Sequence, residues 1–317
     1  MHGIHTATLE LLPSGLLRVA VPTSISWTPG QHVFIRFLTS DLHLLTAHPF
    51  TISSVCRDPS ETGASSELIF YIKPRSGVTG RLASIAAKQP GISKKILIEG
   101  PYGGVSAHHM ARFDSLLVIA GGSGGGFSLA MVDEALRLSS QSSGENHFGA
   151  GRRNLQVIFS TRDMCMADWY TEEIESRLSQ STTLSADPDN SFSTSVSVHI
   201  TSSSCASSNR ESTYSSSSFD SEEKAAKKMP SPEITTTGSF SLNVHRNARP
   251  DIPGLVARTV TTSRMRIGPG AKKPRVGVLV CGPASMLHDT RNAAAVAQAR
   301  ALGGEVEELY LHSEPFA

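Results

Sequence analysis

The sequence predicts an antiparallel β-barrel followed by a doubly wound α/β domain with a parallel sheet. Short strand-like segments separated by Gly, Pro and Ser turns occupy roughly the first hundred residues, a spacing typical of a small antiparallel barrel. After residue 113, continuous apolar strands alternate with helical segments, which is the pattern of a parallel sheet covered on both faces. A length of 317 residues suits two domains, and we expect them to span residues 1–105 and 106–317.

Turn signals delimit the strands of the first domain. "PSG" separates two apolar runs as a hairpin turn would, and "TPGQ" precedes the next strand. A helix is expected from Thr79 to about Lys88, with the Thr79 hydroxyl as its N-cap. The expected strands are TATLELL (6–12), LLRVAVP (16–22), HVFIRFL (32–38), LIFYIKP (68–74) and KKILIEG (94–100).

In the second domain about five parallel strands are expected to alternate with helices. The strands are SLLVIAGG (115–122), LQVIFSTRD (155–163), VSVHIT (196–201), RVGVLVCGP (275–283) and EELYLHS (307–313). The helices between them are FSLAMVDEALRL (127–138), DWYTEEIESRL (168–178) and SMLHDTRNAAAVAQARAL (285–302). The first two of these helices gather apolar residues on one face, as a helix packed on a sheet does.

A Ser-rich segment interrupts this alternation. Of the 30 residues from Ser191 to Asp220, 17 are Ser or Thr, and residues 202–242 show almost no apolar periodicity. Such a stretch buries too little apolar surface to offset its ordering entropy. We therefore expect a disordered insertion in the α/β domain at about 202–242, either an inert loop expansion or a phosphorylated segment.

Composition argues against several classes of function. The formal net charge of +1 indicates no attraction to nucleic acid or to a membrane surface. The four Cys form no CxxC pair, and the His108–His109 pair, without carboxylate or Cys partners nearby, is expected in a solvated loop, so no metal site is predicted. No apolar run reaches the ~18–20 residues of a membrane span, and the N-terminus lacks a signal-peptide pattern. As given, the chain is expected to be soluble and intracellular.

Three strand ends carry ligand-like features at one sheet edge. "AGGSGGG" (120–126) lies between a strand and a helix, where backbone N–H groups can bind phosphate. It matches neither GxGxxG nor a Walker loop, so a dinucleotide site and a plain tight turn both stay open. "CGPASM" (281–286) places Cys281 at the carboxyl edge of the sheet, as buried filler or as a ligand contact. "STRD" (160–163) ends a third strand there, and its Arg162 suits a phosphate.

"AHPFTISS" (47–54) is the unusual stretch of the first domain. A structural strand alternates apolar and polar residues, whereas this one sets an aromatic ring beside hydroxyl groups. A barrel ahead of a nucleotide-binding sheet is a known arrangement for a flavin on the barrel and a nicotinamide on the sheet.

Seven motifs occur in the order seen in the ferredoxin–NADP reductase superfamily. They are PGQHVFIRF, HPFTISS, GVTGRL, GPYGG, AGGSGGG, CGPASM and EPF. The chain resembles this superfamily, and most closely the dehydrogenase half of fungal ferric-chelate reductases and NADPH oxidases. "WTPGQHVFIRF" and "RPDIPGL" (249–255) look specifically like fungal ferric reductases. The resemblance covers nearly all the chain except the Ser-rich insertion.

The resemblance implies that hydride passes from NADPH to FAD and that single electrons then leave the flavin for haem. In the barrel, Phe50 would lie against the flavin ring and Thr51 would hydrogen-bond near its reactive nitrogen. His48 stands where relatives often carry an Arg that faces the FAD phosphates. The FAD-binding residues implied are His48, Pro49, Phe50, Thr51, Gly77 and Thr79.

In the α/β domain the resemblance implies a nicotinamide-nucleotide site. Cys281 would position the nicotinamide, Arg162 would hold the adenosine end, and Phe316 would cover the flavin until nicotinamide displaces it. Thr51, Cys281 and Phe316 are therefore the expected catalytic residues. The nucleotide-binding residues implied are Gly100, Pro101, Tyr102, Gly121, Gly122, Ser123, Gly124, Arg162, Cys281, Gly282, Pro283 and Phe316.

Two departures from the relatives bear on these expectations. Relatives usually follow the loop glycines with Ile or Val, whereas this chain continues Gly125-Gly126-Phe127-Ser128, and the extra glycine is expected to loosen the loop. Relatives also carry a haem-binding bundle of membrane helices ahead of the barrel. The chain is thus expected to be either a fragment or truncated form of a plasma-membrane ferric reductase or a freestanding module.

Several functional readings stay open from the sequence. The first is an NADPH-dependent flavoprotein reductase, with haem, ferric iron, oxygen or a quinone as acceptor. The others are a catalytically degenerate module with a binding or regulatory role and a soluble diaphorase.

Overall fold

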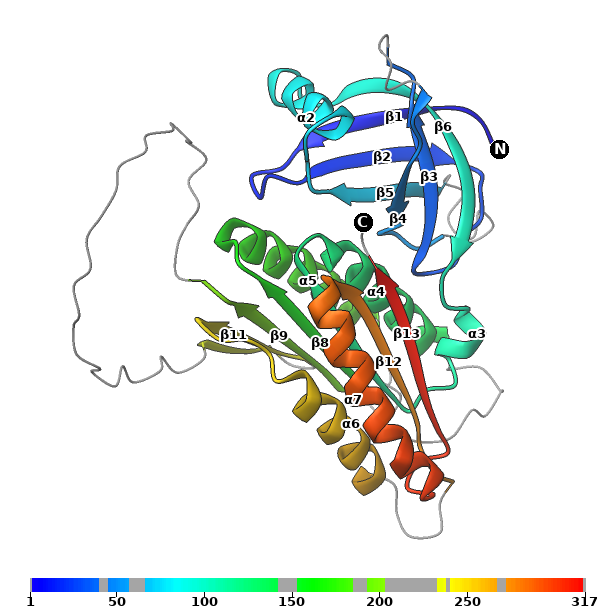
Figure 1. Cartoon of the computed structure of the whole chain (residues 1–317), viewed down its shortest axis with the longest axis vertical. Coiled ribbons are helices and arrows are strands. Elements are labelled where there is room, and N and C mark those ends of the chain that lie inside the picture. Colours follow the sequence, from blue (N-terminus) through cyan, green and yellow to red (C-terminus); the bar gives the residue numbers. More distant parts are fainter. Residues whose placement is uncertain are drawn as a thin grey trace, which may run out of the picture.

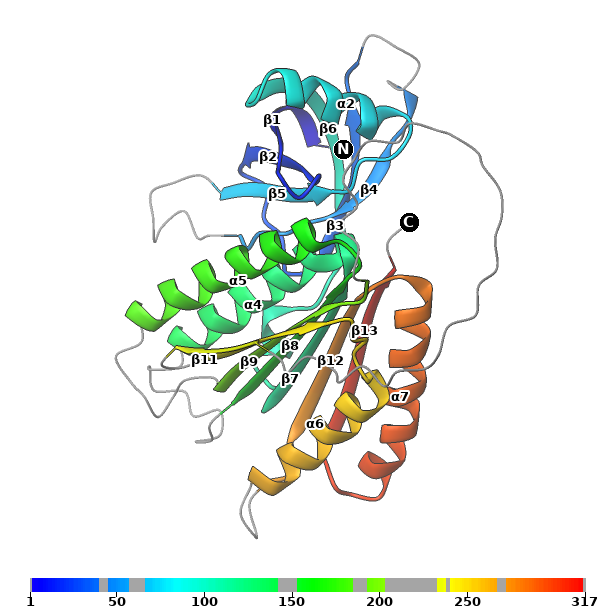
Figure 2. The same ribbon diagram turned by 90° about the vertical axis from the view of Figure 1, so that its left-hand side faces the viewer.

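The computed structural model describes residues 2–39, 45–56, 66–141, 153–184, 193–202, 233–237, 240–266 and 272–315. These residues form two sheets, one above the other in Figure 1, joined by the short helix α3 (Ala107–Met110). A view from the side shows helices on both faces of the lower sheet (Figure 2). The predicted fold class is confirmed.

The upper sheet is antiparallel and curls around its own core. Its strands lie in the order β4-β3-β6-β1-β2-β5, and α2 (Val78–Lys88) packs against β1 and β2. Apolar side chains that alternate along the strands fill the interior, as the period of two requires. The strands are β1 (His2–Leu11), β2 (Leu17–Thr23), β3 (Gln31–Phe37), β4 (His48–Thr51), β5 (Ser66–Ile72) and β6 (Ile92–Gly103).

The predicted N-cap of α2 is wrong. The helix begins at Val78, and the cap position is Gly77, whose φ of 94° suits glycine. No side chain caps this end. The hydroxyl of Thr79 instead accepts a hydrogen bond from the backbone N–H of Arg75 at 3.0 Å. Thr79 therefore fixes the loop that leads into the helix and leaves the first-turn N–H groups without a side-chain cap.

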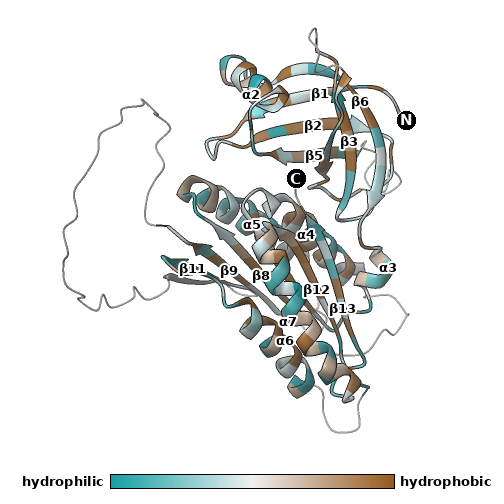
Figure 3. Cartoon of the chain, viewed as in Figure 1, coloured by the Kyte–Doolittle hydropathy of each residue, from teal (hydrophilic) through white to brown (hydrophobic). Residues whose placement is uncertain are grey.

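The lower sheet has seven strands in the order β10-β11-β9-β8-β7-β12-β13. All neighbours pair in parallel except β10 and β11. Every residue of β7 is buried, and β12 is mostly hydrophobic along its length (Figure 3), as strands covered on both faces should be. The strands are β7 (Ser115–Gly121), β8 (Asn154–Thr161), β9 (Ser193–Ile200), β10 (Glu233–Thr237), β11 (Phe240–Arg246), β12 (Arg275–Gly282) and β13 (Glu308–Pro315).

Two pairs of helices cover the lower sheet. On one face lie α4 (Gly125–Gln141) and α5 (Met164–Leu184), whose apolar side chains share a core with β7, β8 and β9. On the other lie α6 (Ile252–Arg266) and α7 (Ala284–Leu302), which share a second core with β12. A 3₁₀ turn, η2 (Gly122–Gly124), joins β7 to α4. Among the described residues, no helix is long and apolar enough to span a membrane.

The prediction of about five parallel strands missed one side of this sheet. β10, β11 and helix α6 were not predicted, and β10 and the start of β11 fall inside the predicted insertion at 202–242. The predicted limit at 242 is therefore wrong. Phe240 and Leu242 alternate with polar residues and are 7% and 3% exposed, so this short segment pairs with β9 in spite of its polar composition. Residues 203–232 lie outside the described residues.

A stacked histidine pair sits where β9 and β11 run side by side. His199 and His245 are paired in the parallel register, and their rings stack with centroids 4.5 Å apart. His199 is 9% exposed, and burial together with the neighbouring His245 lowers the pKa of His199 to about 4. The native fold therefore holds His199 neutral at a pH where the unfolded chain protonates it.

This pair predicts a loss of stability on mild acidification. Because the folded pKa of about 4 lies below the unfolded value of about 6.5, the unfolded chain binds the extra proton across that interval. The free energy of unfolding should fall by on the order of 1–3 kcal/mol as the pH drops from about 6.5 to about 4. In the His199→Gln variant, the free energy of unfolding measured with denaturant should depend less steeply on pH across this range.

The matched control is His108→Gln, which removes an exposed histidine. Its free energy of unfolding should depend on pH as steeply as that of the wild type. An unchanged pH dependence in His199→Gln would contradict the assignment.

Candidate functional site

A cavity of about 750 Å³ lies between the curled sheet and the carboxyl edge of the parallel sheet. This volume is in the range of small-molecule and cofactor sites. Both domains supply its walls, so the cavity exists only when they pack together. It is lined by His32, Phe34, Thr46, His48, Pro49, Phe50, Thr51, Ser53, Phe70, Tyr71, Ile72, Lys73, Arg75, Ser76, Gly77, Val78, Thr79, Ser123, Gly124, Phe127, Cys281, Glu314 and Pro315.

Strand β4 forms the apolar wall, and all four of its predicted residues, from His48 to Thr51, line the cavity. The ring of Phe50 meets those of Phe37 and Phe70 edge-on, with centroids 6.4 and 6.5 Å away. The barrel core therefore fixes this ring at the cavity surface. Nε2 of His48 lies 3.1 Å from the hydroxyl of Thr46.

The start of α2 forms the cationic end of the cavity. Gly77 and Thr79 line it as predicted, together with Lys73 and Arg75, which the sequence analysis missed. Uncapped N–H groups at a helix N-terminus attract phosphate, and two adjacent cations strengthen that preference. The signal was present in "KPRSGVTG" (73–80), where two cations precede the glycine-rich start of a helix.

The glycine-rich loop and the end of β12 form the opposite wall. Ser123, Gly124 and Cys281 line the cavity as predicted. A Cβ on Gly124 would lie 2.5 Å from the backbone oxygen of Cys281, so that position needs glycine.

The next two glycines, Gly125 and Gly126, which were expected to loosen this loop, are closely packed. Both lie in the first turn of α4. A Cβ on Gly125 would lie 3.1 Å from the Phe159 ring, and one on Gly126 would lie 2.2 Å from the hydroxyl of Ser53 in the other domain. The glycines therefore let α4 pack tightly against its neighbours.

Other predicted residues lie away from the cavity lining. Gly121, Gly122, Gly282 and Pro283 adjoin Ser123 or Cys281 in the chain but do not line the cavity, and a Cβ on Gly121 would lie 2.9 Å from Cδ of Pro283. Gly100, Pro101 and Tyr102 belong to β6, and the Tyr102 ring lies 6.0 Å from that of His32. Arg162 is exposed at the carboxyl end of β8. Phe316 lies outside the described residues.

Burial controls the chemistry of Cys281. The residue is 2% exposed, and burial, with a further contribution from the charge of Glu314, raises the pKa of its thiol to about 12. Cys281 is therefore a neutral thiol at neutral pH, which suits contact with a ligand rather than nucleophilic attack.

The described residues hold no group of three or more His, Cys, Asp or Glu side chains arranged for a metal.

Glu314 and His32 are cavity residues that the sequence analysis missed. Both line the cavity, and Nδ1 of His32 lies 3.1 Å from Oε1 of Glu314. The two belong to different domains, so sequence spacing could not pair them. They lie within the quoted motifs "PGQHVFIRF" and "EPF", which is the signal that was available.

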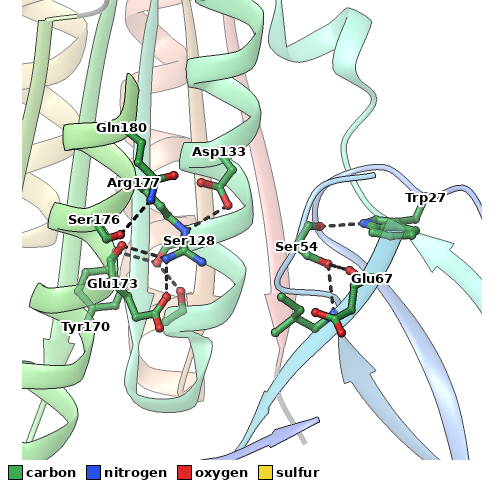
Figure 4. A network of polar contacts seen from close by, with 12 residues as sticks. Trp27, Ser54, Glu67, Ser128, Asp133, Tyr170, Glu173, Ser176, Arg177 and Gln180 are labelled. Carbon is green, nitrogen blue, oxygen red and sulfur yellow. Dashed lines mark hydrogen bonds and ion pairs between the residues drawn. The ribbon is translucent and has the colours of Figure 1, made fainter. Parts of the chain in front are cut away.

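A half-buried charge network braces the domain that carries the nucleotide loop. Figure 4 shows Arg177 of α5 between Asp133 of α4 and Glu173, beside the hydrogen bond between Ser128 and Tyr170. Burial alone would lower the pKa of Arg177, but these two carboxylates raise it, so the guanidinium stays charged. The network holds α4 and α5 together behind the loop.

The residues present fit a flavin dinucleotide that meets a second nucleotide. One end of the cavity offers a fixed aromatic ring and a hydroxyl, and the other offers cations beside an uncapped helix start. Ser123 and Gly124 of the glycine-rich loop face them from the second domain. Ring-binding, phosphate-binding and nucleotide-facing elements thus line one cavity.

Comparisons with known proteins agree with a cavity that binds a flavin and a second nucleotide. The model of an FAD-binding domain matches residues 1–106, and the model of the ferric reductase NAD binding domain matches residues 113–295. The second match spans more than half of the chain.

Curated relatives come from fungi. The probable cell surface ferric reductase kap2 of Aspergillus oryzae is 34% identical over 171 residues, which is 52% of this chain and 21% of the relative. Ferric reductase transmembrane component 4 of Saccharomyces cerevisiae is 32% identical over 176 residues, 54% of this chain and 22% of the relative. The aligned region thus covers about a fifth of the length of these curated relatives.

Solved structures share the fold. A flavohemoglobin from Malassezia yamatoensis with bound FAD and heme matches with a TM-score of 0.52 at 15% identity, covering 99% of this chain and 60% of that one. The CS-b5R domains of human Ncb5or in the NAD⁺ form match with a TM-score of 0.52 at 14% identity, covering 98% and 69%. By the family-model match over more than half of its length, the chain belongs to the ferric reductase family, and it comprises an FAD-binding domain and a ferric reductase NAD-binding domain.

Proposed function

We propose that the chain takes hydride from NADPH onto FAD and passes single electrons to a haem or ferric iron acceptor. The observation that carries this proposal is the single cavity, in which the FAD-motif residues 48–51 and 77–79 face Ser123, Gly124 and Cys281 of the nucleotide motifs. We assign residues 1–105 to the flavin and 106–317 to the nicotinamide nucleotide. The family matches at 1–106 and 113–295 support this division.

Flavin supplies the chemistry, because it accepts a two-electron hydride and releases electrons singly. The protein's part is to bind, orient and exclude water. Phe50 offers a ring fixed by Phe37 and Phe70, and Thr51 offers a hydroxyl beside it. Cys281 offers a neutral, compact side chain at the carboxyl edge of the parallel sheet, where doubly wound folds bind nucleotides.

We also propose roles for Arg162 and Phe316. Arg162, exposed at the end of β8, would bind the 2′-phosphate that distinguishes NADPH from NADH. Phe316 would cover the flavin before the nicotinamide arrives, since it directly follows Pro315, which lines the cavity.

The proposed electron acceptor and cellular location are inferred from the names of the curated relatives. The relatives are named cell surface ferric reductase and ferric reductase transmembrane component, and they extend well beyond the aligned region. We propose that this chain works with a haem-bearing membrane part of such a protein at the plasma membrane, facing the cytosol.

The proposed transfer of hydride from NADPH to FAD can be tested with the purified chain. The flavin absorbance of the chain with bound FAD should bleach when NADPH is added. A flavin that binds but is not reduced would indicate a non-catalytic module.

Removing the ring and the hydroxyl of β4 should strongly weaken flavin binding. The Phe50→Ala/Thr51→Ala variant should lose about a hundredfold in FAD affinity, because it gives up a buried aromatic contact and a hydrogen bond. Fluorescence titration with FAD measures this, and NADP⁺ binding reports whether the α/β domain remains folded. The matched control Phe50→Tyr/Thr51→Ser keeps a ring and a hydroxyl and should bind FAD nearly as well as wild type. Equal affinity in the alanine variant would refute the site.

Removing Arg162 should change the choice of nucleotide. The Arg162→Ala variant should bind NADPH about tenfold more weakly and NADH almost unchanged, because a charge-assisted contact to the 2′-phosphate is lost. Steady-state KM values for the two nucleotides measure this. Arg266→Ala, which removes an exposed arginine at the far end of α6, is the control. An equal loss for both nucleotides would count against a 2′-phosphate contact.

A further inference from the structure

The His32–Glu314 pair crosses the boundary between the two domains. His32 lies on β3 of the curled sheet and Glu314 near the end of β13 in the parallel sheet. Nδ1 of His32 and Oε1 of Glu314 are 3.1 Å apart, with side chains 29% and 14% exposed. Because a carboxylate can only accept, the imidazole N–H donates this bond. A hydrogen bond to a charged group at partial burial is among the stronger ones.

Strand register connects this pair to both halves of the cavity. In the curled sheet, His32 is the direct partner of Thr51 across β3 and β4. In the parallel sheet, Glu314 is the partner of Cys281 across β13 and β12. The His32–Glu314 hydrogen bond therefore joins the strand pair that carries the flavin-side hydroxyl to the pair that carries the nucleotide-side thiol. All four residues line the cavity.

The neighbours of His32 hold its ring in place. Its centroid lies 5.9 Å from that of Phe34 and 6.0 Å from that of Tyr102. Gly103 adjoins the pair: a Cβ there would lie at ordinary contact distance, 3.6 Å from Nδ1 of His32 and 3.8 Å from Oε1 of Glu314. The imidazole thus needs little reorganisation to keep its hydrogen bond.

Other polar groups near the carboxylate do not replace His32. Nε2 of His312 lies 3.7 Å from Oε2 of Glu314, which is beyond hydrogen-bond distance. Burial lowers the pKa of His312 against the opposing effect of Glu314, so this imidazole is neutral at neutral pH. Cys281 is likewise uncharged. Among the described residues, His32 is the hydrogen-bond partner of this carboxylate.

We propose that His32 is a positioning residue of the hydride-transfer site. By holding Glu314 across the interface, it keeps the Cys281 edge of one sheet aligned with the Thr51 edge of the other. The inference rests on the proposed function, because alignment matters only if two ligands react between these edges. Displacing reacting groups by about 1 Å can cost about a hundredfold in rate.

Two substitutions of His32 separate its hydrogen bond from its bulk. In His32→Leu the donor is lost and a branched side chain remains. In His32→Asn the amide nitrogen stands the same number of bonds from the backbone as Nδ1, so a donor is kept. The matched control is His109→Leu, which breaks a second histidine–glutamate pair, His109–Glu308 at 3.2 Å, outside the cavity.

The first readout is independent of turnover. Amide hydrogen exchange of the full chain without cofactors should become about fivefold faster at residues 312–314 in His32→Leu. His32→Asn should retain the wild-type protection, and His109→Leu should leave these residues unchanged. The second readout is single-turnover reduction of bound FAD by NADPH. His32→Leu should be slower by about tenfold or more at unchanged FAD affinity, with His32→Asn within about threefold of wild type.

The outcomes distinguish this inference from the function on which it rests. If the wild-type chain is not reduced by NADPH, the proposed function fails, while the exchange experiment still reports on the cross-domain contact. If reduction proceeds but His32→Leu matches wild type in rate and exchange, the positioning role is overturned. It is also overturned if His32→Asn is as slow as His32→Leu, because a kept donor should rescue the rate.

Discussion

The close approach of helix α4 to the barrel is the constraint on which the site depends. A Cβ on Gly126 would lie 2.2 Å from Oγ of Ser53, and one on Gly30 would lie 2.5 Å from Cε of Met131. Gly30 also has a φ of 74°, which favours glycine at that turn. Edge-to-face packing of Tyr71 on Trp169, with centroids 4.8 Å apart, completes this contact. Because neither domain encloses the cavity alone, these contacts create it.

The chemistry of the cavity follows from this docking. Burial raises the pKa of the Cys281 thiol, so it stays neutral. The docking of the two domains brings His32 to Glu314, while the barrel by itself supplies the cationic end of the cavity at the uncapped start of α2. The protein thereby offers a binding surface that is apolar where a ring system would lie and cationic where phosphates would lie. Hydride transfer between two bound cofactors depends chiefly on their orientation.

Much of the fold could be predicted from local pattern. The parallel strands β7, β8, β9, β12 and β13 are apolar runs that end at turns, and the barrel strands alternate with period two. Strand β11 was missed because it follows a Ser-rich stretch, and its few apolar residues become informative only when β9 lies beside them. The N-cap of α2 was wrongly given to Thr79, since a hydroxyl near a helix start can also bond to the preceding loop, as it does here to Arg75.

The fold class, the family and the strand from His48 to Thr51, which lines the cavity, could all be predicted from the sequence alone. Those features depend on residues that are close together in the chain, so spacing and composition carry them. Three further features required the folded structure: which motif residues share a cavity, the packing role of Gly126, and the contact between Glu314 and His32. Each of these depends on a contact between segments far apart in the sequence, where the geometry of docking, rather than local pattern, sets which atoms meet.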